Sequence, residues 1–243
     1  MSNLLKFTTV DPINGMNSKN PGKAQNLLSG EWLDTSKYFD NIPDPLTGEY
    51  FIDIPDTEDL SDFIQNLEKC PKSGLHNPLK NNERYVMLGN VCAKAAALLS
   101  NKEVEDFFVH LIQRVMPKSS NQCLGEVMVT RKFLENFSGD GVRFLARSFS
   151  NPGDHLGQES SGYRWPFGAV SIIAPFNFPL EIPALQVLGA LFMGNRPLVK
   201  VDSKVSVVFE QFLRLLIHCG MPPSDLDFIN CRGETMGELI KQC

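Results

Sequence analysis

The chain has 243 residues, of which 42% are hydrophobic and 21% are charged, and its net charge is −5. This length is enough for one large domain or two small ones, and the composition is that of a globular protein, which excludes disorder over the whole chain. The acidic balance argues against nucleic-acid binding, because phosphates require a broad basic surface.

Residues 1–26 are predicted to form a flexible N-terminal tail. They contain three lysines, one aspartate and no arginine, and they lack the apolar core of a secretory signal. A mitochondrial presequence is usually amphipathic and rich in arginine, so the segment matches that class poorly.

Residues 27–160 are predicted to form a section of short strands followed by helices. The turn at residues 44–49 and the apolar run at residues 50–54 indicate short strands around a turn. Apolar residues then recur at helical spacing, and glycines near residue 140 are expected to bend the last helix. The expected helices span residues 83–100, 103–115 and about 121–149.

Residues 161–243 are predicted to form part of a cofactor-binding domain, because strands and helices alternate there. The run at residues 169–174 is nearly all apolar and β-branched, as expected for a buried parallel strand. The order strand, helix, strand, helix, strand is half of a doubly wound, Rossmann-like sheet, so the fold class is α/β. The expected segments are residues 169–174, 181–193, 197–201, 204–219 and 226–230.

Neither a membrane span nor a metal site is predicted. The most apolar stretch, residues 166–194, is interrupted by Pro175, Pro179 and Pro183, and no basic flank sets an orientation in a membrane. The six cysteines form no Cys-x-x-Cys pair, and only four histidines are present. Free thiols are therefore a better interpretation than a zinc ribbon or a disulfide framework.

Three polar residues follow the strands of the predicted sheet, at the edge where open α/β sheets bind ligands. The Asn177 amide could stabilise an oxyanion, or it makes loop hydrogen bonds. Lys200 could meet a ribose or a phosphate, or it is an exposed lysine at a strand end. Ser203 is most simply the cap of the next helix, although it also stands beside a helix end that could face an anionic cofactor. Spacing alone favours the structural alternatives.

Other catalytic signals are weak. No Gly-x-Gly-x-x-Gly follows a strand and no P-loop is present, so an ordinary Rossmann dehydrogenase is not supported. Glu181 suits the start of a helix, or it lines a pocket. None of the cysteines has an obvious nucleophile setting, and Cys231 and Cys243 lack a neighbouring base.

Longer motifs carry more information than these single residues. The general ones are Gly30-Glu31-Trp32 and residues 44–49 (DPLTGE), 166–170 (PFGAV), 174–179 (APFNFP) and 200–203 (KVDS). The more specific ones are residues 76–78 (HNP), 111–115 (LIQRV), 129–137 (VTRKFLENF), 142–149 (VRFLARSF), 162–166 (GYRWP) and 200–206 (KVDSKVS). With these motifs the chain resembles the N-terminal half of the aldehyde dehydrogenase superfamily, and most of all the plant-type pyrroline-5-carboxylate (glutamate-semialdehyde) dehydrogenases. The resemblance covers nearly everything after about residue 27.

The resemblance implies a cofactor site. Lys200 would bind the adenosine ribose hydroxyls, and Ser203 would lie beside that ribose, where many relatives have glutamate. NAD is therefore the expected cofactor, and NADP is not excluded. Gly233 would fall in the turn under the adenine. The cleft would also be lined by Ala174, Pro175 and Phe176.

The resemblance also implies a reaction, the oxidation of glutamate semialdehyde to glutamate in proline catabolism. A cysteine thiolate attacks the aldehyde, hydride leaves to NAD, and a glutamate activates the water that releases the acid. Asn177 would hold the oxyanion of the thiohemiacetal, and Phe178 and Glu181 would face the substrate tunnel.

The family's nucleophilic cysteine and base glutamate would lie after Cys243, so the 243 residues alone are expected to be inactive. The alternative is a truncated, non-catalytic product that acts only as a weak nucleotide-binding or interaction fragment. The partial sheet is expected to expose an apolar face that aggregates or recruits a partner. Full-length relatives are expected to be homo-oligomers in the mitochondrial matrix, with a cytoplasmic location as the alternative.

Overall fold

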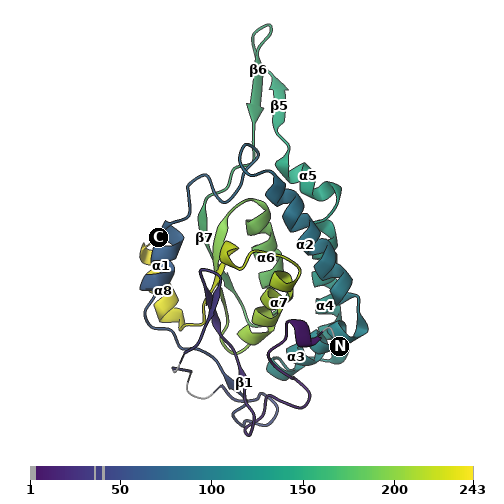
Figure 1. Ribbon diagram of the computed structural model, residues 1–243, viewed down its shortest axis with the longest axis vertical. Helices are drawn as coiled ribbons and strands as arrows, with labels where there is room; N and C mark the ends of the chain where they lie inside the picture. Colours follow the sequence, from purple (N-terminus) through teal and green to yellow (C-terminus); the bar gives the residue numbers. More distant parts are fainter. Residues whose placement is uncertain (1–3, 36, 40–41, 243) are drawn as a thin grey trace.

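A mixed five-stranded sheet stands at the centre of the computed structural model, which describes residues 4–35, 37–39 and 42–242 (Figure 1). The strand order is β3-β2-β9-β8-β7. The last three strands are parallel, whereas β2 runs antiparallel to both β9 and β3. The strands are β2 (Asn26–Leu28), β3 (Glu31–Leu33), β7 (Ala169–Ala174), β8 (Arg196–Val201) and β9 (Asp227–Phe228).

The predicted alternation of strands and helices after residue 160 is confirmed. Helix α6 (Glu181–Phe192) connects β7 to β8, and α7 (Ser206–His218) connects β8 to β9. Strand β8 is buried along its whole length, and its two faces meet different helices because side chains alternate along a strand. Val199 and Val201 belong to the larger core, which also holds apolar residues of α6 and α7. Leu198 belongs to a second cluster with α1 (Ser61–Glu68) and α8 (Gly233–Gln242).

Helices form a second layer beside α6 and α7 (Figure 1). The predicted helix at 83–100 is confirmed within one residue, and so is the one at 103–115, where Phe107 and Phe108 are buried. The third predicted helix is shorter than expected: it ends at Asn136, and a separate helix follows Gly139, whose φ is +59°. The helices are α2 (Glu83–Leu99), α3 (Lys102–Val115), α4 (Ser120–Asn136) and α5 (Asp140–Ala146), and a 3-10 turn, η2 (Pro223–Asp225), precedes β9.

A β-hairpin follows α5 and begins at Phe149, where the third predicted helix was expected to end. Strands β5 (Phe149–Pro152) and β6 (Glu159–Gly162) pair antiparallel, and all of their residues are exposed. The hairpin stands out from the body of the molecule (Figure 1). The polar residues of this segment offer no apolar face that would hold it as a helix against the core.

The described part of the N-terminal segment is packed, which corrects the expectation of a flexible tail over residues 1–26. A 3-10 turn, η1 (Leu4–Lys6), leads to Phe7, whose ring meets the Phe107 ring edge-on at 6.5 Å. Met16 and Ala24 are also buried in the larger core. Strand β1 (Gly22–Lys23) pairs with β4 (Ile52–Asp53). Buried apolar area is the physical reason that this segment is ordered. The boundaries at 27–160 and 161–243 stay predictions.

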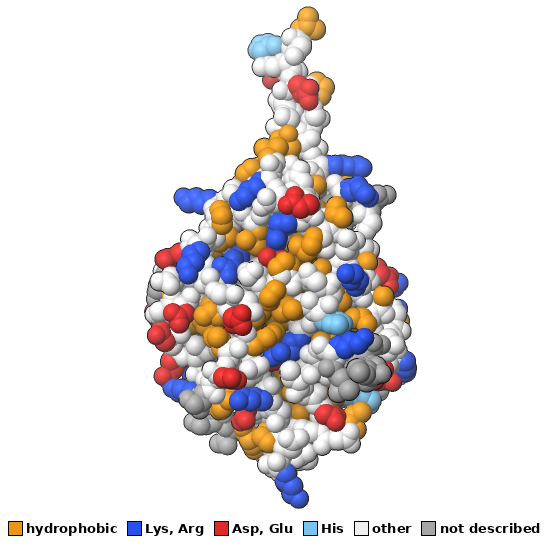
Figure 2. All heavy atoms as spheres, viewed as in Figure 1, with side chains coloured by type: hydrophobic (Ala, Val, Ile, Leu, Met, Phe, Trp, Pro, Cys, Tyr) orange, Lys and Arg blue, Asp and Glu red, His pale blue; other side chains and the backbone are white. Residues whose placement is uncertain are grey.

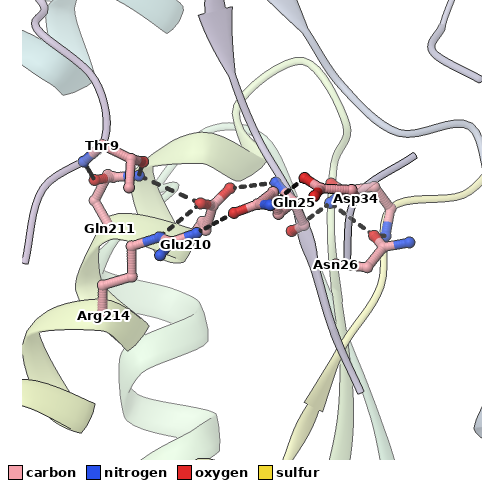
Figure 3. A network of polar contacts seen from close by, with 8 residues as sticks. Thr9, Gln25, Asn26, Asp34, Glu210, Gln211 and Arg214 are labelled. Atoms are coloured by element: carbon pink, nitrogen blue, oxygen red, sulfur yellow. Dashed lines mark hydrogen bonds and ion pairs between the residues drawn. The ribbon is translucent and has the colours of Figure 1, made fainter. Parts of the chain in front are cut away.

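Polar contacts also fasten the N-terminal segment to α7 (Figure 3). The Gln25 backbone N–H donates to Glu210 Oε2 at 2.8 Å, and Arg214 Nε donates to Glu210 Oε1 at 2.8 Å. Gln211 accepts from the Thr9 backbone N–H at 2.9 Å and donates to Thr9 Oγ1 at 2.8 Å. We call these five residues the α7 clasp.

Strand β7 is an edge strand and is less buried than predicted, because β8 is its only partner among the described residues. Ile173 is 48% exposed, and Phe167 just before the strand is 88% exposed. Figure 2 shows that hydrophobic side chains gather in patches between charged ones on the face viewed in Figure 1. In the described ranges, no helix has both the length and the apolar character needed to cross a membrane.

Candidate functional site

The predicted site residues that follow β7 and β8 lie close together, at the carboxyl ends of these two strands. Strands β7 and β8 are parallel and in register, with Ile173 opposite Lys200 and Ala174 opposite Val201. The Asp202 backbone N–H donates to the Ala174 carbonyl at 3.2 Å, just beyond the paired residues. The loop that carries Asn177 and the turn that carries Ser203 therefore leave the sheet side by side, at the carboxyl ends of parallel strands.

A pocket of about 590 Å³ brings three of the predicted cofactor residues together. Lys200, Ser203 and Gly233 all line it, although they come from β8, the following turn and the start of α8. A cavity of this size is in the range of small-molecule sites. The other lining residues are Phe39, Ile42, Asp202, Lys204, Cys231, Arg232 and Glu234.

Lys200 is buried rather than an exposed lysine at a strand end. It is 9% exposed, and its one hydrogen bond among the described residues is a long one, 3.4 Å from Nζ to the Val201 carbonyl. No ion pair of Lys200 occurs among the described residues. A buried ammonium needs acceptors, so Lys200 is suited to oxygen atoms of a molecule in the pocket. Burial raises the pKa of the neighbouring Cys231 thiol to about 11, and the Lys200 charge opposes this.

Ser203 is not the helix cap that the sequence predicts. Helix α7 begins three residues later, at Ser206, and no side chain caps it. The Ser203 hydroxyl instead donates to the Cys231 carbonyl at 3.5 Å. The intervening residues form a turn, in which Asp202 Oδ1 accepts from the Lys204 backbone N–H at 3.0 Å. Asp202 therefore organises this turn, and Ser203, which caps no helix, lines the pocket.

Gly233 leaves space in the lining of the pocket. A Cβ placed on it would meet no atom within 4 Å, and it is the first residue of α8. Its neighbour Arg232 is a lining residue that the sequence did not indicate. Arg232 Nε and Nη2 donate to Asp56 Oδ2 at 2.9 and 2.7 Å, and its guanidinium lies 5.0 Å from the centroid of the Phe39 ring.

The loop between β7 and α6 presents the other predicted residues. Asn177 is exposed, and none of the hydrogen bonds of the described residues involves its side chain, so the alternative of loop hydrogen bonds finds no support. Phe176 and Phe178 are 51% and 39% exposed. Pro175 is also exposed, whereas Ala174 is buried at the end of β7. The loop therefore offers an amide between two aromatic side chains.

Two residues of a distant segment fix the start of α6, and sequence reasoning missed both. Glu126 Oε1 accepts from the backbone N–H of Leu180 at 2.8 Å and of Glu181 at 3.3 Å. Lys118 Nζ donates to Glu126 Oε2 at 3.0 Å and lies 4.1 Å from the centroid of the Phe178 ring. Burial raises the pKa of Glu181, and the Glu126 carboxylate raises it further.

A signal for Glu126 did exist in the sequence. It stands one helical turn from Cys123, on the face of α4 that also buries Val127 and Leu134. A carboxylate on an apolar helix face is rarely buried without a partner. Its partners could not be identified, because Leu180 lies 54 residues away.

Comparison with known proteins gives one consistent result. A model described as "Aldehyde dehydrogenase family" matches residues 44–242. Over 242 residues the chain is 53% identical to "Delta-1-pyrroline-5-carboxylate dehydrogenase 12A1, mitochondrial" of Arabidopsis thaliana. That match covers 99% of this chain and 43% of the Arabidopsis protein, so the chain spans less than half the length of this relative.

Solved structures share the fold. A putative methylmalonate-semialdehyde dehydrogenase from Sinorhizobium meliloti 1021, complexed with NAD, superposes with a TM-score of 0.72 at 23% identity, over 90% of this chain and 43% of its own. An NADP-dependent glyceraldehyde-3-phosphate dehydrogenase from Bacillus halodurans C-125, complexed with NADP, gives a TM-score of 0.69 at 23% identity, over 89% and 45%.

Proposed function

The chain belongs to the aldehyde dehydrogenase family, and on that premise we propose that it forms the cofactor-binding and oxyanion-binding part of an enzyme that oxidises glutamate semialdehyde to glutamate. The substrate follows from the similarity to the Arabidopsis protein, whose name specifies pyrroline-5-carboxylate, the cyclic form of that aldehyde. The same name supports a mitochondrial location, with the cytoplasm as the alternative. A homo-oligomeric state of the full-length protein is part of the proposal.

The burial of Lys200 is the observation that best supports a cofactor site in this pocket. Its buried ammonium lacks strong acceptors within the described chain and faces a pocket with open space above Gly233. The ribose hydroxyls of a nicotinamide dinucleotide supply such acceptors, and the cofactor supplies hydride acceptance when it is bound. Ser203 adds a neutral hydroxyl to the same wall. We propose NAD as the cofactor, and the titration described below compares its affinity with that of NADP.

We propose separate roles for the residues at the end of β7, in the loop after it and at the start of α6. Asn177 donates its amide N–H to the oxyanion that forms when a thiolate attacks the aldehyde, because it is exposed and its side chain has no competing hydrogen bond among the described residues. Phe178 and Glu181 face the substrate, and Ala174, Pro175 and Phe176 border the cofactor. Burial raises the pKa of all five described cysteine thiols, which disfavours the nucleophilic thiolate, so we propose that this chain alone binds cofactor without turnover.

Calorimetric titration of the 243-residue protein with NAD and with NADP tests the cofactor site. Lys200→Met removes a buried donor to the ligand, and we expect NAD affinity to fall roughly ten- to hundredfold. Lys204→Met is the matched control, because Lys204 lines the same pocket but is exposed. Equal NAD affinity in the wild type and Lys200→Met would refute the assignment, and tighter binding of NADP would change the cofactor.

A spectrophotometric assay with pyrroline-5-carboxylate and NAD tests the proposed lack of turnover. We expect no NADH from the 243-residue protein. NADH formation that is abolished in Asn177→Ala would overturn this part of the proposal and would support the oxyanion role of Asn177 directly.

A further inference from the structure

The loop of residues 175–180 is held between two fixed points. At one end, Ala174 is the last paired residue of β7, and its carbonyl accepts from Asp202. At the other end, the backbone N–H groups of Leu180 and Glu181 are bound by the Glu126 carboxylate. Only five residues lie between these points, and proline fixes φ at two of them, Pro175 and Pro179.

Helix α6 has no cap of its own. Leu180 stands at its N-cap position and provides no side-chain hydrogen bond. The first N–H groups of a helix need acceptors, and an acidic group at this end also interacts favourably with the helix dipole. Glu126 of α4 meets both needs from another part of the chain, with its side chain completely buried.

Lys118 fixes the carboxylate itself. Its side chain is 11% exposed, and its ammonium contacts Glu126 Oε2 and the face of the Phe178 ring. One buried ion pair thus touches the loop at two places, through the α6 amides and through an aromatic side chain next to Asn177. A charge-assisted bond of this kind is stronger and shorter than a neutral one.

We propose that Glu126, anchored by Lys118, is the positioning residue that sets the place of Asn177 at the end of β7. The assignment rests on the proposed function, because it matters for chemistry only if Asn177 binds the oxyanion. No hydrogen bond within the described part of the chain fixes Asn177 directly, so its place depends on the two ends of its loop.

Amide hydrogen exchange and ¹H–¹⁵N spectra of the 243-residue protein test this assignment. In Glu126→Leu, which removes the acceptor at similar volume, we expect exchange of the Leu180 and Glu181 amides to become roughly ten- to hundredfold faster. The last turn of α6 should keep its protection. In Glu126→Gln, a carbonyl acceptor remains, so protection should return while both amide protons shift upfield with the loss of the charge.

Glu135→Gln is the matched control, because Glu135 lies on the same helix and its ion pairs with Arg131 and Lys132 are more exposed. If Glu126→Leu does not fold, the shifts in Glu126→Gln decide alone. We also expect the Asn177 side-chain amide signals to shift in Glu126→Gln and to stay in place in Glu135→Gln. Unchanged Asn177 side-chain shifts in Glu126→Gln would overturn the assignment, and so would unchanged exchange of the Leu180 and Glu181 amides in a folded Glu126→Leu protein. Failure of the proposed function would appear separately, as absent NAD binding by the wild type.

Discussion

Gly194 allows two loops beside the sheet to approach each other closely. It ends α6 at φ +82°, and a Cβ on it would lie 1.9 Å from the His76 carbonyl oxygen. Its own carbonyl accepts from the Leu75 backbone N–H at 2.7 Å. We expect Gly194→Ala to lower the free energy of unfolding by about 2 kcal/mol or more, from both backbone strain and overpacking. Urea denaturation measures this.

Gly189 provides the control, because it lies inside α6 and a Cβ there would meet nothing within 4 Å. Gly189→Ala should stabilise the protein by up to about 1 kcal/mol. If both substitutions have the same small effect, the close approach between Gly194 and His76 is not a determinant of stability.

The sequence predicts a site residue correctly when its position at the end of a single strand determines where it lies. Lys200 follows from its position at the end of β8, but its burial depends on the packing of residues distant in sequence, including Arg232 and Phe39 at the same pocket. The capping role of Ser203 was wrong, because the Asp202 side chain organises the turn first. Glu126 was missed because its partners are tertiary.

Among the elements, α7 carries a completely buried carboxyl group, Glu210, that should make the stability of the protein depend on pH. Burial raises the pKa of Glu210 to about 7, and the Arg214 charge opposes the shift. A carboxyl group with a raised native pKa favours folding at low pH, and this contribution is lost as pH rises from about 4.5 toward 7. We expect a loss on the order of 3 kcal/mol, measured as the free energy of unfolding across this range.

Glu210→Gln removes the titrating group, so its stability should change less over the same pH window. Asp53→Asn is a comparison variant, since burial also raises the pKa of Asp53 but it lies outside the α7 clasp. Parallel pH curves for the wild type and Glu210→Gln would show that the clasp does not control the dependence.

Elements were predicted well where a pattern is local. Helix α3 was found because its apolar residues fall on one face, and β7 because a β-branched run lies between Gly168 and Pro175. The exposure of β7 was not predictable, since it depends on which strands lie beside it. The β5–β6 hairpin was missed because its segment has no apolar periodicity.

At the scale of the whole molecule, we expect the exposed edge strand β7 to govern self-association of the protein. Phe167, Ile173 and Phe176 expose apolar surface along or beside β7, where backbone groups on one side have no strand partner among the described residues. Such an edge favours pairing between chains. We expect the 243-residue protein to self-associate and Phe167→Lys to shift it toward monomer in sedimentation velocity.

Leu46→Lys serves as the comparison, because Leu46 is 68% exposed but lies in a turn away from this sheet. A wild-type protein that sediments as a monomer at every concentration would contradict the expectation. So would an equal effect of the two lysine substitutions.

The position of β9 in the middle of the sheet has a consequence for synthesis. Leu27 pairs with Phe228, and Thr9 binds Gln211 across 202 residues. Strand β2 is made early on the ribosome and must therefore wait until residues 227–228 are made before it can pair with β9. Pairings this distant in sequence slow folding. Strand β1 can pair with β4 and β2 with β3 early, but Leu27 stays without its β9 partner throughout that interval. An unpaired strand edge of this kind is prone to aggregation until its partner is made.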